Sequence, residues 1–222
     1  MRVHLGNIPA TQGSDPEAEG LRIIRSPRSG IGHLLASLTG LFLLVVPITT
    51  LCLVLSTFAI PNPDVNPDYV PPVEWGAAFM AMLSFIPLHE LLHLMWHPRF
   101  GTSDQSILVI WPSKLLFGVY YEGCMSRTRW LLMRIAPFVF LSILPAVFIA
   151  IFQYVAFAHT TKTFMEVVMV LNAVGSGADV AATLLVASQV PHSASVCFRG
   201  GKAYWRQATA VSKAGSAIAP DG

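Results

Sequence analysis

Residues 75–96 read WGAAFMAMLSFIPLHELLHLMW, an apolar run with a Trp at each end. A hydrocarbon core of about 30 Å is crossed by about 20 helical residues, and Trp favours the interface on either side. The C-terminal part of this run nevertheless carries His89, Glu90 and His93. A charged side chain at the bilayer centre costs on the order of 3 kcal/mol or more. The stretch therefore predicts a membrane-spanning helix that contains a functional site.

The spacing of these polar residues indicates a metal ligand set. The two histidines are four residues apart, so a helix presents them on one face. Ring nitrogens in this pattern suit a zinc ion, and the carboxylate beside the first His can take a proton from water. We therefore predict His89 and His93 as zinc ligands and Glu90 as the general base. The alternative is a purely structural role, which the rarity of this pattern within an apolar span disfavours.

The composition places the chain among polytopic membrane proteins. Of its 222 residues, 54% are hydrophobic and 12% are charged, and the mean hydropathy is +0.59. Soluble domains carry about 25% charged residues. A net charge of +2 without a basic run argues against nucleic acid as a partner. The three cysteines, Cys52, Cys124 and Cys197, lack a metal-binding spacing and are odd in number, so we predict packing roles and no disulfide framework.

Four segments are apolar and long enough to cross a membrane, which predicts an all-α polytopic membrane protein with four transmembrane helices. They are Leu34–Ile60, Trp75–Trp96, Trp130–Ala158 and Phe164–Val190. Between the second and third, Ile107–Trp111 and Leu115–Tyr121 are β-prone runs separated by Pro112-Ser113-Lys114. We interpret them as a short β-hairpin near the membrane surface. It either only packs there or offers a strand edge to an extended substrate chain.

The segments outside the spans predict the orientation. Arg and Lys gather in residues 1–30, 97–129 and 193–222, whereas the loop 61–74 has none and the loop 159–163 has one. By the positive-inside rule, we expect a multi-pass protein of the cell membrane with both termini in the cytoplasm. We expect a flexible cytoplasmic N-terminal segment at 1–30, a membrane-embedded metallopeptidase domain at 31–192 and a cytoplasmic tail at 193–222, disordered beyond about residue 205.

With this orientation the second and fourth spans run in the same direction. His89 lies 14 residues after Trp75, and Asp179 lies 15 residues after Phe164. At a rise of about 1.5 Å per residue, both lie about 21–23 Å below the outer surface and can meet at one depth. A carboxylate in mid-span needs a partner, so we predict Asp179 as the third zinc ligand. The alternatives are Glu166, His159 and His97.

Two further polar residues belong to this region. Asn172 precedes Asp179 by seven residues and therefore shares its helix face. We predict that Asn172 hydrogen-bonds the substrate backbone or a developing oxyanion; the alternative is a polar tie between helices. Arg134 lies one turn inside the third span, where it either extends to the interface or acts electrostatically at the site.

On these residues the chain resembles the intramembrane metalloproteases of the site-2 protease type, which carry a His-Glu-x-x-His helix and a distant Asp preceded by an Asn. It is more similar to the small zincin-type membrane peptidases, which place a Gly-rich stretch before that Asp. The resemblance covers about residues 34–190 and implies that His89, His93 and Asp179 are ligands and Glu90 the base. Val180 follows Asp179 here, where site-2 proteases usually have Gly.

The sequence therefore predicts a zinc-dependent, membrane-embedded endopeptidase that acts on a membrane-associated protein or peptide, with Zn²⁺ as cofactor and the lipid bilayer as surroundings. The alternative is a metal-binding or divalent-ion-transporting membrane protein that uses the same residues without hydrolysis. A third possibility is an inactive scaffold that retains the fold.

Overall fold

The fold was analysed in a computed structural model. It describes residues 1–6, 19–25, 74–114, 116–152, 159–199 and 202–207, together with isolated positions between 16 and 50. Most of the predicted first span, Leu34–Ile60, lies outside the described residues, as do the loop 61–73 and the tail from residue 208.

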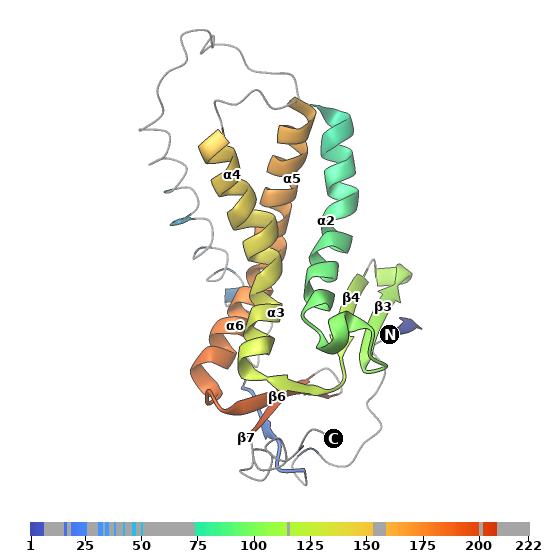
Figure 1. The fold of residues 1–222 in the computed structure, drawn as a ribbon, viewed down its shortest axis with the longest axis vertical. Helices are drawn as coiled ribbons and strands as arrows, with labels where there is room; N and C mark the ends of the chain where they lie inside the picture. Colours follow the sequence, from blue (N-terminus) through green and yellow to red (C-terminus); the bar gives the residue numbers. More distant parts are fainter. Residues whose placement is uncertain are drawn as a thin grey trace, which may run out of the picture. The chain divides into compact units, whose positions relative to one another are not determined.

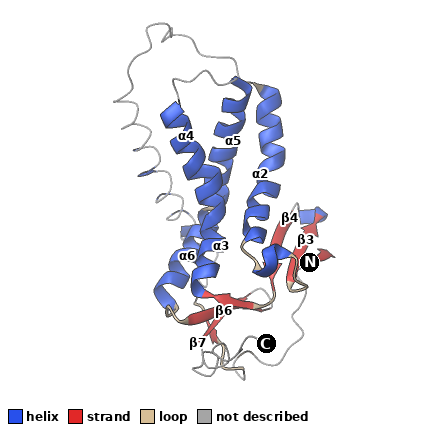
Figure 2. Ribbon diagram, viewed as in Figure 1, coloured by secondary structure: helices blue, strands red, loops and turns tan. Residues whose placement is uncertain are grey.

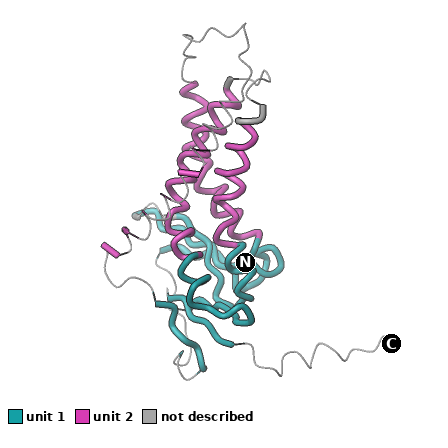
Figure 3. The backbone as a smooth tube through the Cα atoms, turned by 90° about the vertical axis from the view of Figure 1, so that its left-hand side faces the viewer, with its two compact units in different colours: residues 1–26, 96–132, 184–222 teal, residues 27–95, 133–183 magenta. Residues whose placement is uncertain are grey.

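The chain forms two compact units (Figure 3). The helical unit consists of residues 27–95 and 133–183, and the sheet unit consists of residues 1–26, 96–132 and 184–222. Strands from the beginning, the middle and the end of the described chain pair with one another in the sheet unit. The expected division into an N-terminal segment, one membrane domain and a tail stays a prediction.

Helices supply most of the described structure (Figures 1 and 2). Helix α2 spans Trp75–Met95, and the short η1 helix follows at Pro98–Gly101. Helix α3 (Arg127–Phe138) continues through the π-helical turn η3 (Val139–Ile143) into α4 (Leu144–Phe152). Helix α5 (His159–Gly175) is followed by α6 (Gly177–Gln189).

Two of the described helices are long and apolar enough to cross a membrane. They are Trp75–Met95 and Arg127–Ile149. Helices α5 and α6 together would form a third span, bent by 47° at their junction. By length and composition, helices that could cross a membrane therefore lie where the second and third spans were predicted. The region of the fourth is a bent helix pair, and the set of four spans stays a prediction.

The surface of α2 matches a lipid environment. Large apolar side chains lie exposed along it, namely Phe79, Met80, Met82, Leu83 and Ile86. The helix buries small residues instead, including Ala77 and Ala81, while α5 packs beside it (Figure 1). Small residues let neighbouring membrane helices approach closely. Helices α2 and α5 therefore pack together on one side, and apolar side chains face outward.

The predicted hairpin is confirmed. Strands β3 (Ser106–Trp111) and β4 (Leu116–Tyr121) are antiparallel, with Trp111 opposite Leu116, and the short η2 helix (Pro112–Lys114) connects them. A third strand, β1 (Arg2–Leu5), pairs in parallel with β3. We expected residues 1–30 to lack regular structure. Four residues carry too little local signal to predict a strand, and the edge of β3 provides the partner.

The second sheet was not predicted. It has the order β2 (Arg22–Ile23), β7 (Lys202–Gln207), β6 (Ala194–Arg199) and β5 (Cys124–Ser126), all antiparallel. The all-α prediction therefore needs correction: the fold is mostly helical but includes two small sheets. The strand β7 also extends to Gln207, slightly past the point where we expected disorder to begin.

The packing role predicted for the cysteines is wrong for two of them, which form one disulfide. Cys124 on β5 lies directly opposite Cys197 on β6, with a Cα–Cα distance of 4.1 Å, and the two are joined in a disulfide. The residues are 73 positions apart, so only strand pairing brings them together. An odd cysteine count did not exclude a bonded pair with one cysteine left over.

Candidate metal centre

The two histidines of the opening stretch lie on the buried face of α2. Their exposed fractions are 9% for His89 and 6% for His93, although many neighbouring residues on the same helix are exposed. One helical turn separates them, and the ring centroids are 4.7 Å apart. Both imidazoles therefore point into the interior of the helical unit.

Asp179 comes from the first turn of α6 and reaches both imidazoles. Its Oδ2 lies 3.1 Å from Nε2 of His89 and 3.3 Å from Nε2 of His93. The two Nε2 atoms are themselves 3.1 Å apart. The structure thus brings the three predicted ligands together, from segments about 90 residues apart.

The tautomer of His93 follows from its partner. Nδ1 of His93 lies 2.8 Å from the backbone oxygen of Met133. A carbonyl oxygen can only accept a hydrogen bond, so Nδ1 carries the proton. In a neutral ring, Nε2 is then left with its lone pair toward Asp179.

The tautomer of His89 follows from the orientation of Asn172. The Asn172 amide nitrogen donates to the Pro137 carbonyl at 3.0 Å and to Ser142 Oγ at 2.8 Å. This places Oδ1 of Asn172 toward His89, where it accepts from Nδ1 at 2.8 Å. In a neutral ring, Nε2 of His89 therefore also presents a lone pair.

Three acceptor atoms thus converge: two imidazole Nε2 atoms and one carboxylate oxygen. Acceptors repel one another at hydrogen-bond distance unless protons or a cation lie among them. Zinc bonds of about 2.0–2.1 Å in tetrahedral geometry separate the ligand atoms by about 3.3–3.4 Å. The three distances of 3.1, 3.1 and 3.3 Å are close to that spacing. The donor set and its dimensions therefore fit zinc.

Arg134 binds the other oxygen of Asp179. Its Nη1 donates to Oδ1 at 2.6 Å, and its side chain is 29% exposed. Of the two alternatives for this residue, the structure favours the electrostatic one. One oxygen of the Asp179 carboxylate accepts from the Arg134 guanidinium, and the other oxygen lies against the two imidazoles.

Glu90 lies beside the histidines. One carboxylate oxygen of Glu90 and one ring nitrogen from each of His89 and His93 lie within 4.8 Å of one another. Its side chain is partly buried. The carboxylate of Glu90 therefore lies beside the position that a metal ion would occupy, next to the three acceptor atoms described above.

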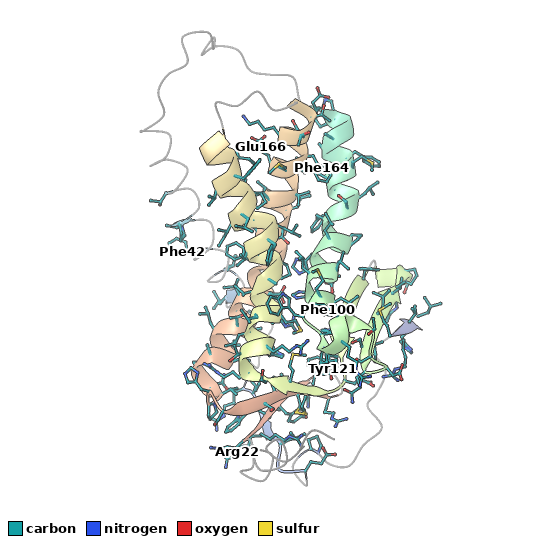
Figure 4. The ribbon with its side chains drawn as sticks, viewed as in Figure 1. Arg22, Phe42, Phe100, Tyr121, Phe164 and Glu166 are labelled. Atoms are coloured by element: carbon teal, nitrogen blue, oxygen red, sulfur yellow. A yellow bond between two sulfur atoms is a disulfide. The ribbon has the colours of Figure 1, made fainter. Side chains whose placement is uncertain are left out.

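The alternative third ligands take other contacts. Glu166 lies on α5 near Phe164 (Figure 4), where it pairs with Lys162 at 3.8 Å. Nδ1 of His97 lies 3.2 Å from Ser106 Oγ within the sheet unit. The side chain of His159 lies outside the described residues.

Sequence reasoning missed the groups that orient the ligands. The Met133 carbonyl is one of them, and a signal for it was present in the chain. Pro137 lies four residues further along α3 and has no N–H, so it leaves the Met133 carbonyl without its helical donor. Ser142, which is fully buried in η3, has no comparable signal.

The chemistry of this centre is that of a metal-dependent hydrolase: two imidazoles and a carboxylate around one position, with a second carboxylate beside it. Residues 82–195 match a protein family with the description "Putative zincin peptidase". The match covers more than half of the chain, and the chain belongs to this family. No curated protein and no solved structure matches it.

Proposed function

We propose that this protein is a zinc-dependent, membrane-embedded endopeptidase. The observation that carries the proposal is the convergence of His89, His93 and Asp179 at zinc spacing, with Glu90 beside them. Membership of the zincin peptidase family supports a zinc metallopeptidase. The site lies on helices apolar enough to cross a membrane, which supports hydrolysis within or next to the bilayer.

The proposed mechanism assigns one role to each polar group. His89 and His93 would hold zinc through Nε2, and Asp179 would hold it through Oδ2. Bound zinc supplies a Lewis acid that polarises the peptide carbonyl and acidifies water. Glu90 accepts a proton as the water oxygen bonds to the carbonyl carbon, and then delivers it to the nitrogen as the C–N bond breaks. The products are a carboxylic acid and an amine.

Arg134 supports the same chemistry electrostatically. A buried carboxylate is stable only when paired, and the guanidinium provides a charge partner at 2.6 Å on the oxygen opposite the metal position. The carboxylate is thereby held so that only Oδ2 faces the imidazoles. Oδ2 is therefore the oxygen of Asp179 that would hold zinc.

The substrate class follows from the location of the centre. Its residues lie in helices whose exposed side chains are apolar, so a soluble globular substrate has poor access to it. We propose a membrane protein or a membrane-associated peptide as substrate, cleaved near the cytoplasmic leaflet of the cell membrane, with both termini of the enzyme in the cytoplasm. This orientation rests on the distribution of Arg and Lys.

The decisive experiment separates catalysis from metal binding. The full chain and its Glu90→Gln variant are reconstituted in proteoliposomes with a panel of single-span peptides, and new peptide termini are identified by mass spectrometry. We expect the variant to bind one zinc but to lose cleavage by a factor of at least about 100, the scale of general base catalysis. Unchanged cleavage by the variant would refute the role of Glu90.

The same proteoliposomes test the transport alternative. Zinc flux without peptide cleavage would replace the peptidase proposal with ion transport. Cleavage without zinc flux would exclude ion transport. If the protein binds zinc but shows neither peptide cleavage nor zinc flux, the inactive scaffold is the supported hypothesis.

A further inference from the structure

Asn172 was predicted to contact the substrate, but its surroundings indicate another role. It is fully buried on α5. Both hydrogens of its amide nitrogen are used, one by the Pro137 carbonyl and one by Ser142 Oγ. Its Oδ1 accepts from Nδ1 of His89. Both ends of the amide therefore bond to the protein itself, and each donor already has a partner.

We infer that Asn172 is a positioning residue that holds His89 in the zinc-binding tautomer. Oδ1 requires a proton on Nδ1, and this leaves Nε2 of a neutral ring as the metal-binding atom. The inference rests on the metal centre of the proposed function but not on proteolysis. The sequence left a polar contact between helices as the alternative role of Asn172. The inference specifies this contact as the hydrogen bond to Nδ1 of His89.

The π-helical turn η3 holds Asn172 in this orientation through Ser142. Ser142 lies in the π-helical turn η3, where the Leu144 N–H bonds to the Val139 carbonyl. Such turns shift the backbone hydrogen-bond register and are frequent at functional sites. Ser142 Oγ donates to the Met169 carbonyl at 3.1 Å and accepts from Asn172 at 2.8 Å.

The result is a hydrogen-bond chain with one direction. The Met169 carbonyl accepts from Ser142, Ser142 accepts from Asn172, and Asn172 accepts from His89. The Met169 carbonyl at the end of this chain can only accept, so the direction of donation in each of the three hydrogen bonds is fixed. Outer groups of this kind orient metal-binding histidines and typically change metal affinity by about 10–100-fold when removed.

The test compares zinc affinity across matched variants of the full chain in detergent micelles, measured by competition with a chelator. Asn172→Leu keeps the number and branching of the side-chain heavy atoms but removes the acceptor and the amide donors, and we expect zinc affinity about 10–100-fold below wild type. Asn172→Asp keeps an acceptor for Nδ1 of His89 but places its second oxygen against the Pro137 carbonyl. We therefore expect its zinc affinity to lie between those of wild type and Asn172→Leu. Val174→Ala, at an exposed position of the same helix, is the control without effect.

A spectroscopic readout distinguishes positioning from general stability. The Co²⁺ protein reports coordination through its visible absorption bands. We expect Asn172→Leu and Ser142→Ala to change these bands at full metal loading, and Asn172→Asp to change them less than Asn172→Leu does. If Asn172→Leu does not fold, Asn172→Asp and Ser142→Ala still decide the question.

Two results would overturn the inference. Wild-type zinc affinity in Asn172→Leu would refute the positioning role by itself, and a simultaneous loss of cleavage would return Asn172 to the substrate-binding role. Equal weakening of zinc binding in Asn172→Leu and folded Asn172→Asp would show that the acceptor is irrelevant. Neither result depends on whether Glu90 is the base, so failure of this inference is distinct from failure of the peptidase proposal.

Discussion

The helical unit and the sheet unit arrange their polar groups differently. In the helical unit, His89, Asn172 and Asp179 are buried and bond to one another or to their neighbours around one centre. The sheet unit also buries polar side chains, among them His97 and Ser106, but its strands are joined by backbone pairing between segments far apart in the sequence. The comparison teaches that the candidate ligands converge through side-chain contacts, whereas the sheets depend on strand pairing.

This difference can be tested by the effect of substitutions on zinc affinity. Changes at the centre should lower it strongly, changes to its supporting helix should lower it moderately, and changes in the sheet unit should leave it unaltered. Three substitutions span this range.

The largest effect is expected for Asp179→Ala. It removes the carboxylate that contacts both imidazoles and leaves Arg134 without its partner on that residue. We expect zinc affinity to fall by more than the roughly 100-fold upper limit typical of outer groups. Zinc stoichiometry, measured on the purified full chain, checks this. Retention of tight binding would mean that another residue is the third ligand.

An intermediate effect is expected for Pro137→Ala. The new N–H at position 137 would compete with His93 for the Met133 carbonyl, which His93 now contacts at 2.8 Å. We expect about 10-fold weaker zinc binding. Helicity and thermal stability should not decrease, because Ala favours the helix interior. Pro145→Ala in α4 serves as the matched control. Equal effects of both substitutions would point to the bend of the helix and not to the freed carbonyl.

The smallest effect on zinc affinity is expected for Cys197→Ser. The substitution removes the link between β5 and β6, and loss of a disulfide destabilises a fold by about 2–4 kcal/mol. We expect the sheet unit to unfold more easily while zinc affinity is unchanged. Faster hydrogen exchange of the β6 backbone amides would measure this unfolding. If zinc affinity fell together with the stability of the sheet unit, zinc binding would not be independent of that unit, contrary to the prediction.

The same cysteines test the proposed orientation. Disulfides are rare in the cytoplasm, whereas the positive-inside rule places residues 97–129 there. The state of Cys124 and Cys197 in cells, determined by alkylation of free thiols, therefore reports the side of the membrane on which the sheet unit lies. The Cys124–Cys197 disulfide of the structure argues against a cytoplasmic sheet unit, whereas the distribution of Arg and Lys argues for one. Free thiols in cells would support the cytoplasmic orientation, and an intact disulfide would refute it.

Local patterns were sufficient for the elements that carry the site. The α2 helix extends over Trp75–Met95, one residue short of the predicted span, because hydropathy and length act within one segment. The β3–β4 hairpin was predicted for the same reason: its two strands are neighbours in the chain. Counting helical rise also predicted that His89 and Asp179 lie at one depth, and they are in contact.

The sequence by itself determined the apolar helices, the hairpin and the candidate ligands, because periodicity, hydropathy and spacing are local properties. The tertiary structure alone decided which groups orient these ligands and which strands complete the sheets. The Ser142–Asn172–His89 chain joins three helical segments, and the Cys124–Cys197 pair closes a separation of 73 residues. Contacts between distant segments depend on how the whole chain packs, and no local pattern encodes them.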